Sequence, residues 1–309
     1  MNPLHIKTPL LRHRLPSGLP LLLKMENLQP SGSFKLRGIG LLCQRAVANG
    51  AKHLVCPSGG NAGFAAAVAG AALGARTTIV VPVTTPESVC DKIRAIGATV
   101  VIQGAVWDES NALALTMCDA HDTVYVPPFD HADIWEGNAT MIDEAVAQAQ
   151  AMEAEFDVVI CAVGGGGLLC GVLEGLHRNG CAKVPVIAVE TIGAASFQAA
   201  VDSGELVTLP AITSIAASLG AKRVAQQAFD WRRRHDIRSA TVSDAEAVDA
   251  CLRFSDDLRT LVEPACGAAL AVAYGEIEEL APFRSPLVVV CGGIGTDLDK
   301  LLAWRAKFN

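Results

Sequence analysis

Lys35 is the residue in this sequence whose surroundings suggest covalent chemistry. It lies in the stretch Ser31-Gly-Ser-Phe-Lys-Leu-Arg-Gly38, where small residues and Pro30 follow an apolar run. A lysine amine condenses with an aldehyde to form a Schiff base, and burial that lowers its pKa makes it a nucleophile near neutral pH. Because lysines in loops are far more often solvated charges, Lys35 alone does not establish such chemistry.

Two glycine-rich turns are candidates for binding anions. Ser58-Gly-Gly-Asn-Ala-Gly63 follows a strand-like run and opens an alanine-rich helix, and Gly164-Gly-Gly-Gly167 follows a second strand and opens a second helix. A helix N-terminus offers unpaired backbone N–H groups and the positive end of the helix dipole. Ser58 could instead be a plain helix cap, and the second turn a plain tight turn. Four consecutive glycines favour an anion site, because each glycine costs backbone entropy.

The composition predicts a globular chain with two lobes. A chain of 309 residues is long for one core, and hydrophobic residues at 51% with charged residues at 18% provide ample apolar surface to bury. The formal net charge is −7. This balance argues against nucleic acid as a partner, since duplex binding relies on clustered lysine and arginine.

The sequence also argues against a membrane protein and a metal hydrolase. Residues 1–15 contain no continuous apolar region of a signal peptide, and the apolar run 21–23 is too short to span a membrane. Ten cysteines without a CxxC pair indicate reduced, buried thiols. The seven histidines include no HExxH motif. We therefore expect a cytoplasmic protein without membrane contact.

Alternating strands and helices indicate parallel sheets with helical crossovers. The expected strands are 54–56, 77–81, 99–102, 123–126, 157–163, 184–189 and 287–290. The expected helices are 38–48, 62–73, 86–96, 106–120, 134–152, 168–177, 243–256 and 267–279. Ser243 with Glu246 three residues later predicts a capping box at the start of the helix 243–256.

Six motifs follow one another along the chain. They are Gln29-Pro-Ser-Gly-Ser-Phe-Lys-Leu-Arg-Gly38, Pro57-Ser-Gly-Gly-Asn-Ala-Gly63, Pro127-Pro-Phe-Asp130, Ile134-Trp-Glu-Gly137, Gly164 to Gly167 and Cys291-Gly-Gly293. In this order they resemble the fold-type II family of pyridoxal-phosphate enzymes, most closely the serine/threonine dehydratases and serine dehydratase-like proteins. The resemblance implies an α/β fold of the tryptophan synthase β type, with two lobes that each contain a mostly parallel sheet flanked by helices. It also implies a large cofactor-binding domain of residues 1–38 and 130–309, into which a small domain of residues 39–129 is inserted.

The resemblance implies pyridoxal 5′-phosphate as the cofactor, bound to Lys35 as a Schiff base. The implied cofactor-binding residues are Lys35, Phe34, Asn61, Gly164, Gly165, Gly166, Gly167, Leu168, Cys291 and Gly292. Phe34 would flank the pyridine ring, although ordinary packing explains an aromatic residue here equally well. Cys291 would face the pyridine nitrogen, and a thiol there makes a weaker electron sink than a carboxylate, which suits elimination. A simple buried cysteine is the alternative.

The same resemblance implies a substrate site and a cation site. The implied substrate-binding residues are Ser58, Gly59, Asn61 and Ala62. They would hold the α-carboxylate of a small hydroxy amino acid, and Asn61 would also reach the 3′-oxygen of the cofactor. The implied ligands of a K⁺ ion are Glu190, Ala194, Ser196, Leu219 and Ala221. Carbonyl and carboxylate oxygens are suitable ligands for K⁺.

The implied reaction is α,β-elimination of water from L-serine or L-threonine, in which Lys35 removes the Cα proton. Release and hydrolysis then give pyruvate or 2-oxobutanoate and ammonia. Serine racemases resemble the 58–63 loop but have serine where this chain has Gly59, so we expect little racemisation. Gly59 also replaces the alanine of more active dehydratases, and Asn138 stands where close relatives have histidine. Relatives are commonly dimers, which makes a homodimer the expected assembly.

Two further alternatives remain open. A β-replacement enzyme such as a cysteine synthase would have a different asparagine-lysine context and a serine-rich phosphate loop. A catalytically silent amino-acid-binding regulator belongs to another functional class. The chain ends at Asn309 without the regulatory domain of the long threonine deaminases.

Overall fold

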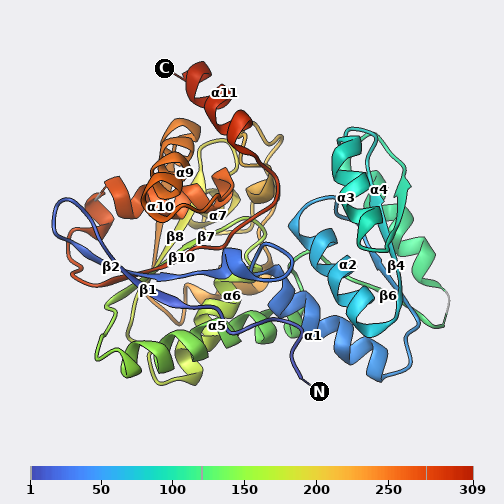
Figure 1. Cartoon of the computed structure of the whole chain (residues 1–309), viewed down its shortest axis with the longest axis horizontal. Helices are drawn as coiled ribbons and strands as arrows, with labels where there is room; N and C mark the ends of the chain where they lie inside the picture. The colour runs from blue at the N-terminus through green and yellow to red at the C-terminus, as the bar shows by residue number, and fades with distance from the viewer. Residues whose placement is uncertain (1, 120, 276, 309) are drawn as a thin grey trace. The chain divides into compact units, whose positions relative to one another are not determined.

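The structure, a computed structural model, describes residues 2–119, 121–275 and 277–308 (Figure 1). The chain forms two compact units. Unit 1 consists of residues 1–6 and 29–137, and unit 2 consists of residues 7–28 and 138–309. Within the described ranges, no helix is both long enough and apolar enough to cross a membrane.

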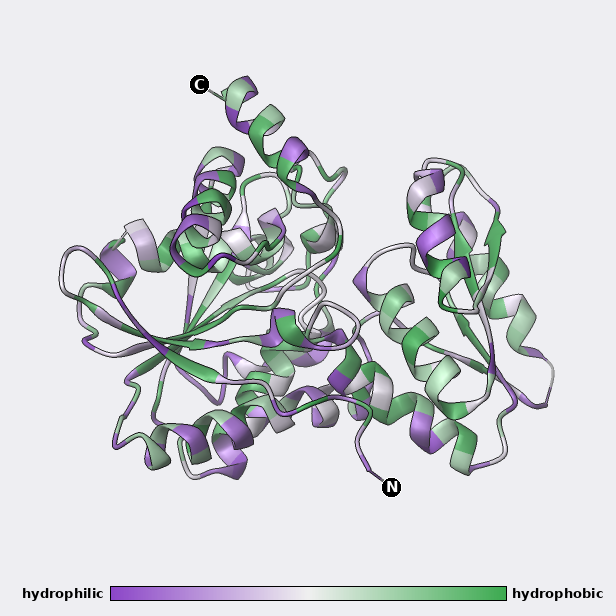
Figure 2. Ribbon diagram, viewed as in Figure 1, coloured by the Kyte–Doolittle hydropathy of each residue, from purple (hydrophilic) through white to green (hydrophobic). Residues whose placement is uncertain are grey.

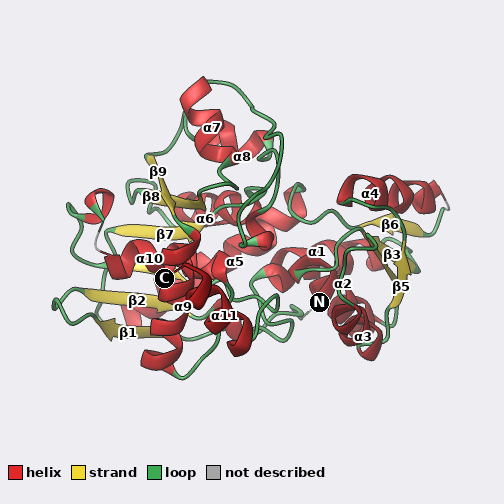
Figure 3. Cartoon of the chain, turned by 90° about the horizontal axis from the view of Figure 1, so that it is seen from above, coloured by secondary structure: helices red, strands yellow, loops and turns green. Residues whose placement is uncertain are grey.

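Unit 1 contains a four-stranded parallel sheet in the order β5-β4-β3-β6. Its strands are β3 (His53–Cys56), β4 (Arg76–Val81), β5 (Thr99–Ile102) and β6 (Thr123–Tyr125). Its helices are α1 (Lys35–Ala48), α2 (Asn61–Leu73), α3 (Glu87–Ala95) and α4 (Trp107–Thr116), which is followed by the 3₁₀ turn η2 (Met117–Asp119). Figure 3 shows α4 along one side of these strands and α3 along the other.

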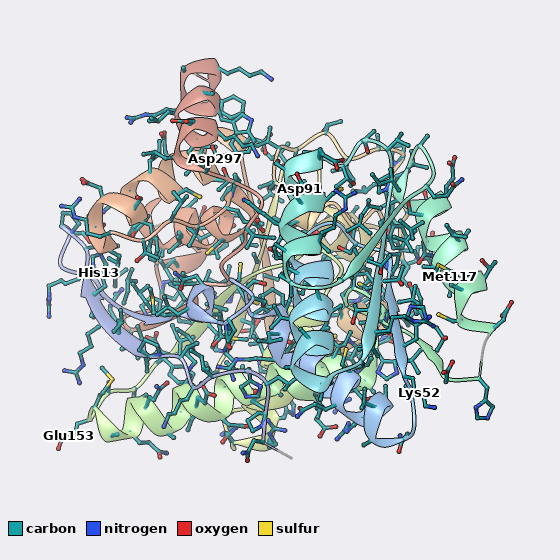
Figure 4. All side chains as sticks on the ribbon, turned by 45° about the vertical axis from the view of Figure 1, so that its right-hand side comes forward. His13, Lys52, Asp91, Met117, Glu153 and Asp297 are labelled. Carbon is teal, nitrogen blue, oxygen red and sulfur yellow. The ribbon has the colours of Figure 1, made fainter. Side chains whose placement is uncertain are left out.

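The core of unit 1 is built by the continuous apolar strands that a doubly covered parallel sheet requires. Val55 of β3 and Val80 of β4 are fully buried and form a cluster with Ala114 of α4. Met117, labelled in Figure 4 just beyond α4, packs against this cluster. Tyr125 also packs there, and its hydroxyl donates to Asn111 Oδ1 at 2.7 Å. These contacts fix α4 on the sheet.

Unit 2 contains a six-stranded sheet in the order β1-β2-β10-β7-β8-β9, in which only the β1–β2 pair is antiparallel among the described strands. Its strands are β1 (Leu10–Arg14), β2 (Pro20–Lys24), β7 (Val158–Ala162), β8 (Val186–Thr191), β9 (Ile237–Val242) and β10 (Pro286–Val289). The middle strands β10, β7 and β8 are buried along their whole length. They appear green in the hydropathy colouring of Figure 2.

Helices cover both faces of this sheet, with α9 and α10 on one side and α5 and α6 on the other (Figure 1). The helices are α5 (Ala132–Ala151), α6 (Gly167–Arg178), α7 (Ser196–Ser203), α8 (Gln226–Trp231), α9 (Asp244–Leu258), α10 (Pro264–Gly275) and α11 (Leu298–Phe308). Short 3₁₀ turns are η1 (Glu26–Leu28), η3 (Ala217–Leu219) and η4 (Glu278–Leu280). All ten cysteines are free, and all except Cys118 and Cys181 are buried.

The predicted α/β class with two mostly parallel sheets is confirmed. The capping box is also present, because Ser243 Oγ accepts from Glu246 N at 3.2 Å and the Glu246 carboxylate accepts from Ser243 N at 2.7 Å. Three predicted helices differ from the observed ones by three residues or more at one end or at both ends. Helix α1 begins at Lys35 instead of residue 38, the helix predicted over 106–120 ends at Thr116, and that over 267–279 begins at Pro264 and ends at Gly275. Residues 120 and 276 of those predictions lie outside the described residues.

The compact units also differ at their edges from the expected domains. Residues 29–38 and 130–137 belong to unit 1 here. Lys35–Ala48 is a single helix, and all of it lies in unit 1. Gly137 closely approaches the backbone of α1, because a Cβ at Gly137 would lie 2.5 Å from Arg37 O. The domain boundaries 38/39 and 129/130 stay a prediction.

A buried lysine links the N-terminal segment of unit 2 to α5. The side chain of Lys24 is 0% exposed at the end of β2. Its Nζ donates to Glu144 Oε2 at 2.6 Å, to Thr8 O at 2.7 Å and to Gln148 Oε1 at 3.0 Å. A buried ammonium group is tolerated only when it is paired and hydrogen-bonded in this way.

We expect Lys24→Ala to lower the free energy of unfolding by about 3 kcal/mol, because it removes a buried ammonium group together with its bonds to Glu144, Thr8 and Gln148. Urea denaturation followed by circular dichroism measures the change. Arg94→Ala is the control, since Arg94 pairs with Glu87 and Asp91 on the solvent-exposed face of α3 and should leave the midpoint nearly unchanged. Equal effects of the two variants would contradict the importance of burial.

Candidate active site

Lys35 is the first residue of α1 and is half-buried. Its Nζ donates to the carbonyl oxygen of Pro128 at 2.6 Å and lies 5.2 Å from the centre of the Phe34 ring. Phe34 itself is 9% exposed. The amine is therefore held in a defined position next to the Phe34 ring. The sequence shows only that the two residues are neighbours in the chain.

The neighbourhood of Lys35 includes the end of β3. Burial raises the pKa of the Cys56 thiol to about 12, and the positive charge of Lys35 opposes this rise. The two side chains are thus close enough to interact electrostatically. Because Cys56 stays neutral at physiological pH, Lys35 rather than this thiol is the candidate nucleophile.

The turn between β3 and α2 presents uncapped backbone N–H groups. Gly60, not Ser58, occupies the N-cap position of α2, and no side chain among the described residues caps this helix. The Ser58 hydroxyl instead accepts from Gly60 N at 3.3 Å, so the plain cap that was the alternative for Ser58 is not formed. Asn61 and Ala62 are the first two residues of α2, and both are buried. This arrangement suits a carboxylate.

Two glycines of this turn are in tight packing. A Cβ at Gly63 would overlap the carbonyl oxygen of Ser58, so only glycine lets the turn lie against the first turn of α2. A Cβ at Gly59 would lie 3.0 Å from Thr85 Cγ2 and 3.1 Å from Val81 Cγ1. The Cβ direction at position 59 therefore faces the end of β4 and the segment that follows it.

The second glycine turn lies in unit 2, between β7 and α6. Gly166 has a φ of +90°, and a Cβ there would lie 2.5 Å from Ala228 Cβ of α8. Ala225 N, just before α8, donates to Gly165 O at 3.0 Å. Within the described chain no side chain caps α6, and Leu168 is buried as its second residue. A tightly packed turn with free helix N–H groups fits a phosphate.

Asn138 supports this turn from α5. Its side chain is buried, and Nδ2 donates to Gly167 O at 3.0 Å. A Cβ at Gly171 would lie too close to Asn138 Cβ, which shows how closely α5 and α6 approach at this point. Asn138, which the sequence analysis noted only as a departure from relatives, therefore helps to hold the Gly164–Gly167 turn.

Cys291 follows β10, the strand next to β7, and is 6% exposed. Its thiol is hydrogen-bonded with that of Cys266, and this bond, burial and the nearby Glu263 carboxylate all raise the pKa of Cys291 well above its usual value. The thiol is therefore neutral and can exchange a hydrogen bond, but it cannot act as an anion. Gly292, next in sequence, has a left-handed φ of +87°.

Sequence analysis missed Glu263. This residue is 4% exposed, its Oε2 accepts from Gly295 N at 2.9 Å, and its carboxyl group lies against Gly293. It therefore holds the segment that follows Cys291. The available signal was an acidic residue inside the apolar run Leu261-Val-Glu-Pro-Ala265. Pro128, whose carbonyl oxygen accepts from Lys35, gave no signal because backbone acceptors leave no trace in sequence.

The residues predicted to hold a cation include a buried carboxylate, that of Glu190. Glu190 is 0% exposed in β8 and accepts from Phe197 N at 2.8 Å and from Gln198 N at 2.7 Å. Burial raises the pKa of Glu190 to about 7, although these bonds oppose the rise. Ser196 Oγ is buried without a hydrogen-bond partner. Ala194 precedes α7 in the same segment.

The other two predicted cation ligands are Leu219 and Ala221, in the segment beside the Gly164–Gly167 turn. Leu219 ends the 3₁₀ turn η3, and Ala221 N donates to Leu219 O at 2.8 Å. A Cβ at Gly164 would lie 2.9 Å from Leu219 Cα. Among residues 2–119, 121–275 and 277–308, no three His, Cys, Asp or Glu side chains are grouped as a metal site.

The predicted residues thus form two groups, one in each unit. Unit 1 contains Phe34, Lys35 and the turn from Ser58 to Ala62. Unit 2 contains Gly164–Gly167, Leu168, Cys291, Gly292 and the residues around Glu190. The turn from Ser58, the turn Gly164–Gly167 and Cys291 each follow the carboxyl end of a parallel strand, where α/β sheets generally bind ligands.

A comparison with known protein families shows the family to which the chain belongs. Residues 1–292 match the model of the family described as "Pyridoxal-phosphate dependent enzyme". The chain belongs to this family. Its two glycine turns and its half-buried lysine therefore belong to a fold that uses pyridoxal phosphate, as the sequence predicted.

Known relatives within the pyridoxal-phosphate-dependent family cover the whole chain. The human protein named "Serine dehydratase-like" is 48% identical over 319 residues, which is 100% of this chain and 96% of the relative. The human "L-serine dehydratase/L-threonine deaminase" is 46% identical over 320 residues, 100% of this chain and 97% of the relative. The crystal structure of a fungal L-serine ammonia-lyase from Rhizomucor miehei superposes with a TM-score of 0.92 at 38% identity, covering 99% of each chain.

We expect Gly63→Ala to lower the free energy of unfolding by about 3 kcal/mol, because the added methyl group must displace the Ser58 carbonyl. Gly40→Ala is the matched control in the same unit. Gly40 lies inside α1, and a Cβ there would lie 3.5 Å from Leu4 Cβ of the N-terminal segment, an ordinary contact. Alanine at this position should raise the free energy of unfolding by about 0.5 to 1 kcal/mol. Urea unfolding measures these opposite changes in the free energy of unfolding. If Gly63→Ala stabilised the protein as Gly40→Ala does, the close approach at Gly63 would be refuted.

Proposed function

We propose that this chain is a pyridoxal-phosphate-dependent ammonia-lyase that converts L-serine, and also L-threonine, to the 2-oxo acid and ammonia. The observation that carries the proposal is the placement of Lys35, whose Nζ is held by Pro128 O beside the Phe34 ring and near the end of β3. The names of the two human relatives and of the fungal enzyme support the same reaction class.

The residues present fit the cofactor. Gly164–Gly167 offer uncapped N–H groups for the phosphate, and Lys35 offers the amine for the covalent link. Cys291 offers a neutral thiol as a hydrogen-bond partner for the pyridine nitrogen. When bound, pyridoxal phosphate supplies an aldehyde for the amine and a ring that withdraws electrons from the substrate Cα.

The substrate carboxylate would bind at the start of α2. Ser58 Oγ and the N–H groups of Asn61 and Ala62 provide hydrogen-bond donors beside the positive end of the helix dipole. When not linked to the cofactor, Lys35 would offer a free amine beside the substrate, and this amine would accept the proton from Cα. One side chain thus serves first as the covalent anchor and then as the base.

Dehydration is favoured over racemisation by the residue at position 59. Inversion at Cα needs a second acid on the opposite face of the substrate, and Gly59 has no proton to give. Its Cβ direction is filled by Thr85 and Val81. Position 59 itself therefore provides no acid for returning a proton to Cα.

We expect wild-type enzyme loaded with pyridoxal phosphate to show the visible absorption band of a lysine-linked cofactor and to release ammonia from L-serine. Lys35→Ala should lose the band and at least about 1,000-fold of the ammonia release, because both depend on the same amine. Lys52→Ala is the control, since Lys52 is exposed before β3 (Figure 4).

Two outcomes would contradict this assignment. Retention of the band in Lys35→Ala would show that another amine binds the cofactor. A normal band in wild type without ammonia release from any hydroxy amino acid would favour the silent binding protein instead.

We also propose that K⁺ binds near Glu190 and stabilises unit 2. Support comes from the buried Glu190 carboxylate, the unpartnered Ser196 hydroxyl and the backbone segments at Ala194, Leu219 and Ala221. A cation would neutralise the carboxylate and give Ser196 Oγ a partner. Carbonyl oxygens and a hydroxyl group are suitable ligands for a monovalent ion.

The pH dependence of this effect follows from the raised pKa of Glu190, about 7. A carboxyl group whose pKa is higher in the folded than in the unfolded state stabilises the fold below its unfolded pKa of about 4.3, and this contribution is lost as the pH rises through 7. K⁺ competes with the proton, so it should raise the melting temperature more at pH 8 than at pH 6. Glu190→Gln should abolish this difference, and equal effects of K⁺ and tetramethylammonium in the wild-type protein would exclude the site.

We further infer a homodimer in the cytoplasm. Ten free cysteines suit a reducing compartment. Leu298 and Leu302 leave apolar surface exposed on α11, 50% and 48% respectively, which is compatible with a partner subunit.

A further inference from the structure

Trp107 is an exposed tryptophan with a specific hydrogen bond. Its side chain is 42% exposed at the first position of α4, so burial is a poor explanation for an indole here. Its Nε1–H donates to the carbonyl oxygen of Pro57 at 2.6 Å, across 50 residues of sequence. Pro57 is buried and immediately precedes Ser58. The contact therefore acts on the turn that is proposed to bind the substrate carboxylate.

The segment that carries Trp107 is held firmly. Gln103 N donates to Val81 O at 2.8 Å, which continues the pairing between β5 and β4 beyond the strand ends. Val83 N then donates to Gly104 O at 2.9 Å. Ser110 Oγ donates to Gln103 O at 2.6 Å, which ties α4 to the same connection. Trp107 thus projects from a well-braced turn rather than from a free loop.

The substrate turn is anchored next to the end of β3, where the backbone N–H of Ser58 donates to the Cys56 thiol. Its internal bond joins Gly60 N to Ser58 Oγ at 3.3 Å, and Ser58 and Gly59 are only half-buried. A Cβ at Gly59 would meet the methyl and hydroxyl groups of Thr85, so Thr85 borders the turn on that side. Because Pro57 has no N–H group, its carbonyl is the polar group by which Pro57 itself can be held. The indole N–H of Trp107 holds this group.

We propose that Trp107 is a positioning residue that orients the Ser58–Gly60 turn toward the substrate α-carboxylate through the carbonyl of Pro57. This inference rests on the proposed function. The peptide plane of Pro57 and Ser58 links the bonded carbonyl directly to the N–H of Ser58. The indole holds this peptide at its carbonyl, and the Cys56 thiol holds it at the N–H of Ser58. Without the indole donor the peptide keeps only its bond to sulfur, and the Ser58 hydroxyl and Gly60 that follow it are less firmly oriented.

The test is Trp107→Phe, which keeps an aromatic ring and removes the donor. We expect the KM for L-serine to rise about fivefold, in keeping with the loss of one hydrogen bond, while kcat stays within about twofold because Lys35 is unaffected. The dissociation constant of L-serinamide, which lacks the carboxylate, should stay unchanged when measured by the spectral shift of the bound cofactor. Trp304→Phe is the control, since Trp304 lies on α11 of unit 2.

Hydrogen exchange of the holoenzyme gives a readout that does not depend on catalysis. Peptides that contain residues 57–60 should exchange faster in Trp107→Phe and at the wild-type rate in Trp304→Phe. Equal weakening of L-serine and L-serinamide, or an unchanged KM with unchanged exchange, would refute the role of Trp107. A wild-type enzyme that gives no spectral response to L-serine would refute the proposed function and this inference together.

Discussion

Strand direction determines where chemistry can be placed in this chain. All four strands of unit 1 are parallel, so the segments that follow them emerge at one edge of the sheet. The contacts of Lys35 with Pro128, of Trp107 with Pro57 and of Thr85 with Gly59 all occur there. An antiparallel neighbour would send alternate connections to opposite edges, and these contacts could not form.

Unit 2 follows the same constraint with different side chains. Because β7 and β10 are parallel neighbours, the glycine turn and Cys291 follow adjacent strand ends. Each is held from outside by a polar group, Asn138 for the turn and Glu263 for the segment after Cys291. Glycine makes these supports necessary, since a flexible backbone that binds an anion gains affinity when neighbouring contacts fix it in advance.

Much of this arrangement could be predicted from the sequence because its signals are local. In two places a strand, a glycine turn and a helix follow one another within a few residues. The family predicted from these and four other short motifs is confirmed. Helices α7, α8 and α11 and strand β9 were not predicted, because they are short or only partly apolar. Glu263, Trp107 and Pro128 act through contacts between distant segments, which no spacing in the sequence reveals. The edges of the two compact units also differ from the expected domain boundaries, and the close packing at Gly137 left no signal in the sequence.

The buried, unpaired cysteines have a practical consequence. Reagents that alkylate sulfur attack the thiolate, and burial disfavours that form at Cys43, Cys56 and Cys161. In the native protein a maleimide will therefore react with Cys118 and Cys181 first. The remaining thiols become reactive only when the surrounding core unfolds. Since they are distributed over both units, mass spectrometry of partly alkylated chains would record which unit loosens first, without any engineered label.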